Sequence, residues 1–167
     1  HLENVDIVMA DILLVAVNAR FNHTNIAVRS IAYYINKPDE VTFGEWTINE
    51  PVLEILRGIA AYHPKVVLFS TYIWNIDIVR RVMREIPKVI PGCIVGAGGP
   101  EAGYRARKIL TEVTALDLVI AGEGEETTAE LVRLYETIQK KAANDGEKKK
   151  KKRALFVARA GKIPGVF

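Results

Sequence analysis

Two short glycine-rich clusters contain the residues of this chain whose types and spacing best suit ligand binding. They are Gly96-Ala97-Gly98-Gly99-Pro100-Glu101 and Gly122-Glu123-Gly124-Glu125. Each cluster follows an apolar, strand-like run and precedes a helix-like run, and the two lie one strand–helix unit apart. Glycine has no Cβ, so a ligand can approach its backbone closely. Two such openings on consecutive units predict one ligand crevice along one edge of a parallel sheet.

The elements that must position these clusters alternate between short apolar runs and longer amphipathic runs. We expect buried strands over residues 12–17, 41–43, 66–69, 93–95 and 117–121. Helices are expected over about 25–36, 51–62, 76–86, 102–113 and 125–141, with Pro87 as a breaker. Thr24 or Asn25 could cap the first of them, and Asn75 could cap the third. Strict alternation predicts a doubly wound α/β fold, Rossmann-like or flavodoxin-like. Its five-stranded parallel sheet would have the order 2-1-3-4-5 and helices on both faces.

Composition divides the chain into one folded body and flanking segments. Residues 10–141 are expected to form the domain, and residues 1–9 to be a cloning remnant or a disordered start. Residues 142–153 are expected to form a lysine-rich linker or loop. Residues 154–167 are expected to form an edge hairpin or the start of a link to a further domain.

The net charge of +3 comes from one segment of the chain. Lys148 to Arg153 are six consecutive basic residues, and without them 17 basic residues stand against 20 acidic ones. This balance does not indicate a nucleic-acid partner. No apolar run approaches the roughly 20 residues of a membrane helix, and the lone Cys93 argues against a disulfide framework or a cysteine-based metal cluster. We therefore expect a cytoplasmic domain with no membrane partner; the oligomeric state stays open.

The loop after the first expected strand excludes several common ligands. It reads Asn18-Ala-Arg-Phe-Asn-His-Thr-Asn25 and contains no glycine, whereas a dinucleotide site needs Gly-x-Gly-x-x-Gly there. A flavodoxin phosphate loop and the acids of a phospho-receiver domain are absent as well. The remaining rim of amides, hydroxyls, glycines and aromatics suits a large flat ligand. Its tail would enter between sheet and helices, where small residues leave space: Ser70, Thr71, Gly98 and Gly99.

Five motifs together resemble a known family. They are Asn18-Ala-Arg-Phe-Asn-His23-Thr-Asn25, Glu45-Trp-Thr-Ile-Asn49, Phe69-Ser-Thr-Tyr-Ile-Trp-Asn75, Gly98-Gly-Pro-Glu101 and Gly122-Glu-Gly-Glu-Glu-Thr127. In these motifs the chain is similar to the N-terminal cobalamin-binding domain of radical S-adenosylmethionine proteins, which include methyltransferases and the anaerobic magnesium-protoporphyrin monomethyl ester cyclase. The resemblance covers about residues 10–140, and residues 154–167 are similar to the link into the radical domain.

The resemblance implies that this domain holds cobalamin and contains no catalytic residue. S-adenosylmethionine and an iron–sulfur cluster would belong to a radical domain elsewhere in the full-length chain, which would be this domain's partner. Methyl transfer or cyclase-type chemistry would follow in the full-length protein. The residues expected to contact the cofactor are Asn18, Arg20, Phe21, His23, Thr24, Ser70, Thr71, Tyr72, Trp74, Gly98, Gly99, Pro100, Glu101, Gly122 and Glu123.

The chain departs from the family pattern in two places. The family's three closely spaced cysteines are absent, so this chain would be only the cofactor-binding half. The Asp-x-His-x-x-Gly signature of many cobalamin domains is absent too, because Phe21 and Ile26 stand where its Asp and Gly would be, on either side of His23. We therefore expect no metal ligand here, and a cobalt whose lower face is unligated or water-ligated. Two alternatives remain: a cofactor-free α/β interaction module, or half of a nucleotide-sugar transferase.

Overall fold

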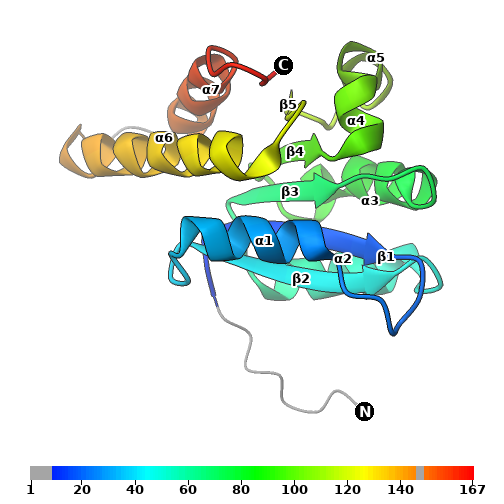
Figure 1. Cartoon of the computed structure of the whole chain (residues 1–167). Helices are drawn as coiled ribbons and strands as arrows, with labels where there is room; N and C mark the ends of the chain where they lie inside the picture. Colours follow the sequence, from blue (N-terminus) through cyan, green and yellow to red (C-terminus); the bar gives the residue numbers. More distant parts are fainter. Residues whose placement is uncertain (1–8, 146–148) are drawn as a thin grey trace.

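Five parallel strands form the middle layer of the structure, in the order β2-β1-β3-β4-β5 (Figure 1). The computed structural model describes residues 9–145 and 149–167, with side chains for 9–141 and 150–167. The strands are β1 (Ile12–Asn18), β2 (Val41–Thr47), β3 (Val66–Ser70), β4 (Ile94–Gly98) and β5 (Leu118–Val119). All pairings between these strands are parallel. The expected fold class and strand order are confirmed.

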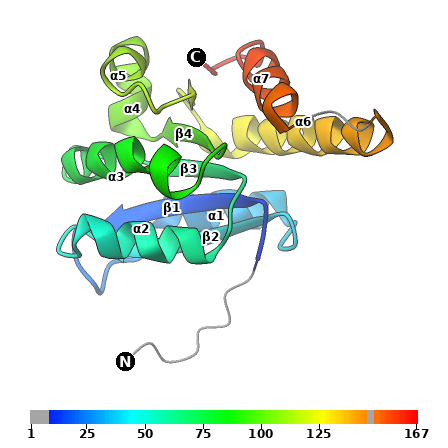
Figure 2. The ribbon, with the colours of Figure 1, turned by 180° about the vertical axis from the view of Figure 1, so that it is seen from behind.

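Helices cover both faces of the sheet (Figures 1 and 2). One face carries α1 (Ile26–Ile35), α6 (Gly124–Asp145) and α7 (Lys149–Ala160). The other carries α2 (Val52–Ala61), α3 (Ile76–Val89), α4 (Pro100–Tyr104) and α5 (Ala106–Glu112). In the described ranges, no helix has both the length and the apolar character that crossing a membrane requires.

The apolar run of β1 explains why the sheet has a core on each side. Leu13, Val15 and Val17 pack toward α2 and α3. Ile12, Leu14 and Ala16 pack toward α1 and α6. Because successive side chains of a strand point to opposite faces, a strand buried on both faces must be apolar throughout. All seven residues of β1 are buried.

Two helix predictions were wrong in detail. Pro87 does not end α3, which continues to Val89 with Pro87 on an exposed surface. Proline at this place removes one hydrogen bond of the last turn, and the next one remains, from Ile90 N to Ile86 O at 2.7 Å. The helix expected over 102–113 is divided into α4 and α5 at Arg105, whose φ of −115° and ψ of 29° are not helical.

The segment after residue 141 also differs from its prediction. Residues 142–145 complete α6, and α7 begins at Lys149. A linker or loop was expected there, followed by an edge hairpin or the start of a link to a further domain. Lysine is a good helix former, and the buried side chains of Phe156 and Ala160 give α7 an apolar face toward α6. Residues 1–8 and 146–148, which belong to the expected start and linker, lie outside the described residues.

The last residues of the chain pair with the edge strand of the sheet, as part of the prediction had expected. Val119 and Phe167 exchange two backbone hydrogen bonds of 2.9 Å, and Ala121 N donates to Gly165 O at 2.8 Å. Val166 forms an antiparallel bridge to Ile120. The last residues therefore cover the edge of the sheet beside β5, as an antiparallel segment that follows a helix.

Candidate ligand-binding site

The strand register brings the loops named from the sequence to one edge of the sheet. Ser70 is the neighbour of Gly98 on β4 and of Ala16 on β1. Asn18 ends β1 opposite Thr47, the last residue of β2. These are the carboxyl ends of the strands, where open α/β sheets bind their ligands.

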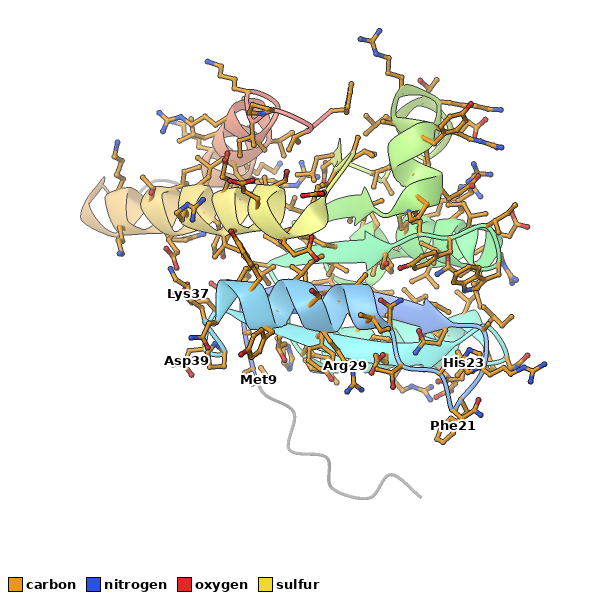
Figure 3. The ribbon with its side chains drawn as sticks, in the orientation of Figure 1. Met9, Phe21, His23, Arg29, Lys37 and Asp39 are labelled. Carbon is orange, nitrogen blue, oxygen red and sulfur yellow. The ribbon has the colours of Figure 1, made fainter. Side chains whose placement is uncertain are left out.

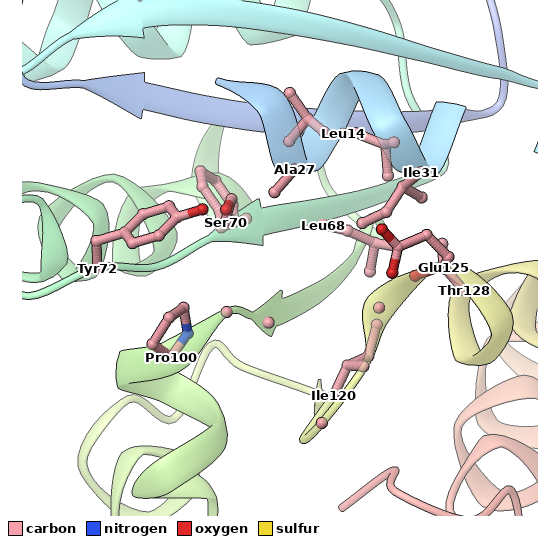
Figure 4. A pocket seen from close by; sticks show the side chains of 16 residues that line it. Leu14, Ala27, Ile31, Leu68, Ser70, Tyr72, Pro100, Ile120, Glu125 and Thr128 are labelled. Carbon is pink, nitrogen blue, oxygen red and sulfur yellow. The ribbon is translucent and has the colours of Figure 1, made fainter. Parts of the chain in front are cut away.

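A cavity of about 170 Å³ opens at this edge, between the strand ends and helices α1 and α6 (Figure 4). Aliphatic side chains of the core layer between the sheet, α1 and α6 line much of it: Leu14, Val28, Ile31, Leu68 and Ile120. Hydroxyl, aromatic and acidic groups are fewer: Ser70, Tyr72, Glu125 and Thr128. Glycine backbone completes the lining at Gly98, Gly99, Gly122 and Gly124. The cavity is thus apolar inside and has few polar groups, as ligand pockets usually do.

The neighbouring glycines of the first cluster have different surroundings. A Cβ on Gly96 would lie 2.5 Å from Leu68 Cδ2, so side chains already fill that space. A Cβ on Gly98 would meet only Ile120, with Cβ–Cβ at 3.5 Å, an ordinary contact. Gly99 has φ +92° and ψ 174°, and its Cβ would lie 2.6 Å from Thr71 O. Gly99 is therefore required by the backbone itself, whereas Gly98 leaves room that the cavity uses.

Thr71 holds the loop after β4 in place. Its buried hydroxyl donates to Gly98 O at 2.7 Å and accepts from Ala102 N at 2.8 Å. Its backbone N–H also donates to Gly98 O at 2.8 Å. Thr71 was expected to contact a ligand tail, but it does not line the cavity; its neighbour Ser70 does.

Asn75 joins the ends of β1 and β3. Its side-chain oxygen accepts from Tyr72 N at 2.8 Å, and its amide donates to Val17 O and Ser70 O at 3.0 and 3.1 Å. Asn75 precedes α3 as expected, but its side chain does not cap that helix. Because it is fully buried and meets three backbone groups, it fixes the turn that carries Tyr72 and Trp74.

A polar network fixes the loop between β1 and α1. Asn18 Nδ2 donates to His23 O at 2.7 Å and to Glu45 Oε1 at 3.3 Å. The same Glu45 oxygen accepts from Asn25 N at 2.7 Å. The expected cap is present as well, since Asn25 Oδ1 accepts from Val28 N at 3.2 Å. The loop is therefore held by hydrogen bonds to β2, although it contains no glycine.

Glu45 is the member of this network that sequence reasoning did not identify. Its second oxygen accepts from Arg29 Nε at 3.2 Å and from Arg29 Nη2 at 2.6 Å. Partial burial opposes its ionisation, but the Asn25 N–H, the Arg29 guanidinium and the Asn18 amide outweigh burial, so the pKa of Glu45 lies below its ordinary value. The only sequence signal was its place in the motif Glu45-Trp-Thr-Ile-Asn49. The adjacent Trp46 is a packing residue whose ring covers Gly44 and Gly58.

Exposed apolar side chains lie on the segments that follow β1, β3 and β4, and we call them the apolar rim. They are Phe21, Ile26, Ile73, Trp74 and Tyr104, each at least 51% exposed. Tyr72 and Trp74 stack with ring centroids 4.3 Å apart and an interplanar angle of 10°. Phe21 projects from the tip of its loop (Figure 3). Several apolar groups exposed together on one face typically mark a binding surface.

Of the remaining predicted site residues, Pro100 and Gly122 line the cavity, and the others do not. Arg20, His23, Thr24 and Glu123 are exposed, and Pro100 begins α4. Glu101 pairs with Arg105, Oε1 to Nε at 3.4 Å. Gly122 has φ +90° and open space beside it. The described residues contain no group of three or more His, Cys, Asp and Glu side chains that could hold a metal ion.

The fold is that of a doubly wound domain with a cavity between its sheet and its helices at the carboxyl edge. The family model for the B12 binding domain matches residues 12–132. That match covers most of the chain, all five strands and the cavity, so the chain belongs to the B12-binding domain family.

Curated relatives agree with this assignment. The anaerobic magnesium-protoporphyrin IX monomethyl ester cyclase of Cereibacter sphaeroides is 27% identical over 92 residues, 55% of this chain and 14% of that protein. The cobalamin-dependent radical SAM methyltransferase TokK of Streptomyces tokunonensis is 32% identical over 82 residues, 49% of this chain and 12% of that protein. The chain thus matches only about one-eighth of the length of these relatives.

A solved structure shows the same fold. The chain resembles the cobalamin-dependent S-adenosylmethionine radical enzyme OxsB with aqua-cobalamin and S-adenosylmethionine bound. The TM-score is 0.61 at 14% identity, and the match covers 77% of this chain and 19% of that one. The chain is therefore a B12-binding domain that is similar to those of cobalamin-dependent radical enzymes.

Proposed function

We propose that this chain binds cobalamin with the nucleotide tail of the cofactor in the cavity and the corrin ring on the apolar rim. The cavity at the carboxyl edge is the observation that carries this proposal. Its volume of about 170 Å³ is below the roughly 300 Å³ of pockets that enclose a whole drug-sized ligand. It therefore suits one part of a large cofactor whose remainder lies outside.

The lining fits the chemistry of such a tail. The aliphatic side chains of Leu14, Ile31 and Leu68 suit the flat apolar base at its end. Ser70 and the backbone of Gly98 and Gly122 suit the sugar and phosphate nearer the opening. Glu125 also lines the cavity; its carboxylate accepts a hydrogen bond from Ser30 at 3.2 Å. The phosphate would therefore lie on the glycine side, away from that carboxylate.

The apolar rim suits the face of a corrin. Trp74 and its stacked neighbour Tyr72 present aromatic surface at the end of β3. The His23 imidazole has no hydrogen-bond partner among the described side chains, whereas imidazoles that ligate metals are usually oriented by one. We propose that His23 does not ligate the cobalt, so that the cobalt has no ligand from this domain.

The whole protein is proposed to be a radical S-adenosylmethionine enzyme. The activities of the relatives, a cyclase and a methyltransferase, support this and leave the substrate open. S-adenosylmethionine and an iron–sulfur cluster would be held by a radical domain of the same full-length protein. Cobalamin supplies the cobalt chemistry when bound, and the residues of this chain bind and orient it.

Mixing the purified chain with hydroxocobalamin tests the proposal. We expect a shifted visible spectrum and coloured protein after gel filtration. Gly98→Val is the matched variant, because its Cβ has room but its methyl groups would enter the cavity. It should weaken binding about tenfold or more and change the melting temperature by only a few degrees. Colourless wild-type protein, or unchanged binding by the variant, would contradict the proposed site. Colourless protein would favour the cofactor-free interaction module.

A further inference from the structure

A second cavity, of about 280 Å³, lies at the opposite end of the sheet. Residues that precede β1, β3 and β4 line one side of it: Asp11, Pro64, Lys65 and residues 90–93. The other side comes from α6 and α7, through Tyr135, Ile138, Gln139, Lys150, Lys152, Arg153 and Phe156. All seven of these residues follow residue 132, where the family match ends. The α6 and α7 side of this cavity is therefore built by a part of the chain that the family model does not include.

The interior of this cavity is apolar and partly aromatic. Phe156 and Ile138 are 2% and 3% exposed. The Phe156 ring meets the Tyr135 ring edge to face, with centroids 6.0 Å apart. Ile90 and Ile94 add aliphatic surface from the α3–β4 connection. The volume is close to the roughly 300 Å³ at which small-molecule pockets begin, so the space suits a small ligand.

The charges around the opening are mostly positive. Arg153 pairs with Asp117, Nη2 to Oδ1 at 2.6 Å. Lys152 Nζ donates to the oxygen of the neutral Gln139 side chain at 3.5 Å. Lys65 and Lys150 are exposed and have no carboxylate partner among the side chains of residues 9–141 and 150–167, which the structure describes. Four cations thus line the cavity against one lining carboxylate, Asp11.

The two other titratable groups that line this cavity do not add negative charge. Tyr135 donates its hydroxyl to Asp11 Oδ2 at 2.9 Å. Burial and this hydrogen bond raise the pKa of Tyr135 above its ordinary value. Burial and the Asp117 charge raise the pKa of the Cys93 thiol to about 12. Both groups are therefore neutral near pH 7, and neither repels an anion.

We propose that this amino-edge cavity binds a small organic anion. An apolar or aromatic body would lie against Ile138 and Phe156, and a phosphate or carboxylate group would meet the lysines at the opening. Charge complementarity and the apolar interior carry the proposal together, because an inorganic ion would leave the interior unused and a neutral ligand would leave the lysines unpaired. The site is separate from the proposed cobalamin site and does not depend on it.

The test adds each of four probes to the whole chain. Calorimetry measures the binding of each probe, and the melting temperature of the protein is a second measure of that binding. 2-Naphthyl phosphate and 2-naphthoate carry the two head groups, 2-naphthylmethanol carries none, and inorganic phosphate lacks the apolar body. We expect at least one naphthyl anion to bind and to raise the melting temperature. The neutral probe and inorganic phosphate should each bind at least tenfold more weakly. The stronger of the two anions identifies the head group.

A pair of double variants locates the binding. Lys65→Gln with Lys150→Gln removes two cations from the opening, and both side chains are exposed, so folding should be unaffected. Lys140→Gln with Lys162→Gln removes two exposed cations elsewhere. The first pair should weaken anion binding about tenfold, and the second should leave it unchanged. Equal loss in both pairs, equal binding of the neutral probe or of inorganic phosphate, or no binding by either anion would overturn the proposal.

Discussion

The two ends of the sheet differ in how their cavities are built. At the carboxyl edge, about 170 Å³ is lined by glycines, hydroxyls and aliphatic groups from the strand ends, α1 and α6. At the amino edge, about 280 Å³ is lined by lysines and by an apolar interior that α7 helps to form. The carboxyl-edge cavity lies among loops that are held by hydrogen bonds to the side chains of Thr71, Asn75 and Glu45. The amino-edge cavity depends on side-chain packing between helices and strand starts.

This difference separates what the doubly wound fold supplies from what an added helix supplies. All strands of a parallel sheet have their carboxyl ends at the same edge. The loops that carry the cobalamin-domain motifs of this chain therefore lie at that edge. The doubly wound fold does not by itself place a binding site at the amino edge. The cavity there exists because α7 packs against α6, with Phe156 buried and Arg153 paired to Asp117. The two edges should therefore respond differently to substitution, to pH and to ligands.

The largest expected effect is at Gly99, compared with a glycine of the other edge. Gly99→Ala should lower the free energy of unfolding by about 3 kcal/mol, because the positive φ is strained for alanine and the new Cβ would meet Thr71 O at 2.6 Å. Gly92→Ala, at the amino edge, has φ +82° but nothing within 4 Å of its Cβ, so it should lose only about 1 kcal/mol. Urea unfolding measures both. Equal losses in the free energy of unfolding would show that the backbone moves at little cost to avoid the close contact between the new Cβ and Thr71 O.

A smaller effect is expected from Glu45→Gln. The lowered pKa of Glu45 means that its ionised form stabilises the folded state. That contribution is fully present above the ordinary pKa and is lost as the pH falls through the lowered folded value. We expect the variant to lose about 1 kcal/mol at pH 7 and the difference from wild type to disappear in acid. Urea unfolding at both pH values is the measurement.

The matched control for this prediction is Glu54→Gln. Glu54 is exposed and pairs only within its own helix, with Arg57 at 2.7 Å, so the change should be close to neutral. Glu45→Gln should also weaken cobalamin binding and leave naphthyl anion binding unchanged, since it loosens the carboxyl edge alone. A stability difference that persists unchanged in acid would contradict the role given to the Glu45 charge.

The smallest effect is expected from His23→Ala. The imidazole is exposed, and the loop conformation uses only the backbone of this residue, His23 O accepting from Asn18 and His23 N donating to Arg20 O at 3.1 Å. We expect the electron paramagnetic resonance spectrum of bound cob(II)alamin to show no nitrogen splitting from His23 and to be unchanged in the variant. Splitting that disappears in His23→Ala would make His23 a cobalt ligand and extend the carboxyl-edge site to its loop tip.

Much of the fold could be predicted because its signals are local. A six-residue apolar run such as residues 12–17 of β1 can be buried only between two helical layers, and alternation with amphipathic helices leaves few topologies. Errors arose where a local signal was weaker than its surroundings. Pro87 lies on the exposed side of α3, and the lysine run that suggested a loop continues into a helix because Phe156 and Ala160 pack on α6.

By itself, the sequence determined the class of fold, the edge at which the glycine clusters lie, and the motifs that resemble a cobalamin domain. These depend on residue types and short spacings, which a single chain displays directly. The tertiary structure alone decided which glycine leaves space and which meets Thr71, and that Glu45 reaches Asn25 from a neighbouring strand. It alone brought Lys65 and Lys152 to one cavity. The reason is physical: such contacts join residues distant in sequence, and their distances depend on how strands register and helices pack.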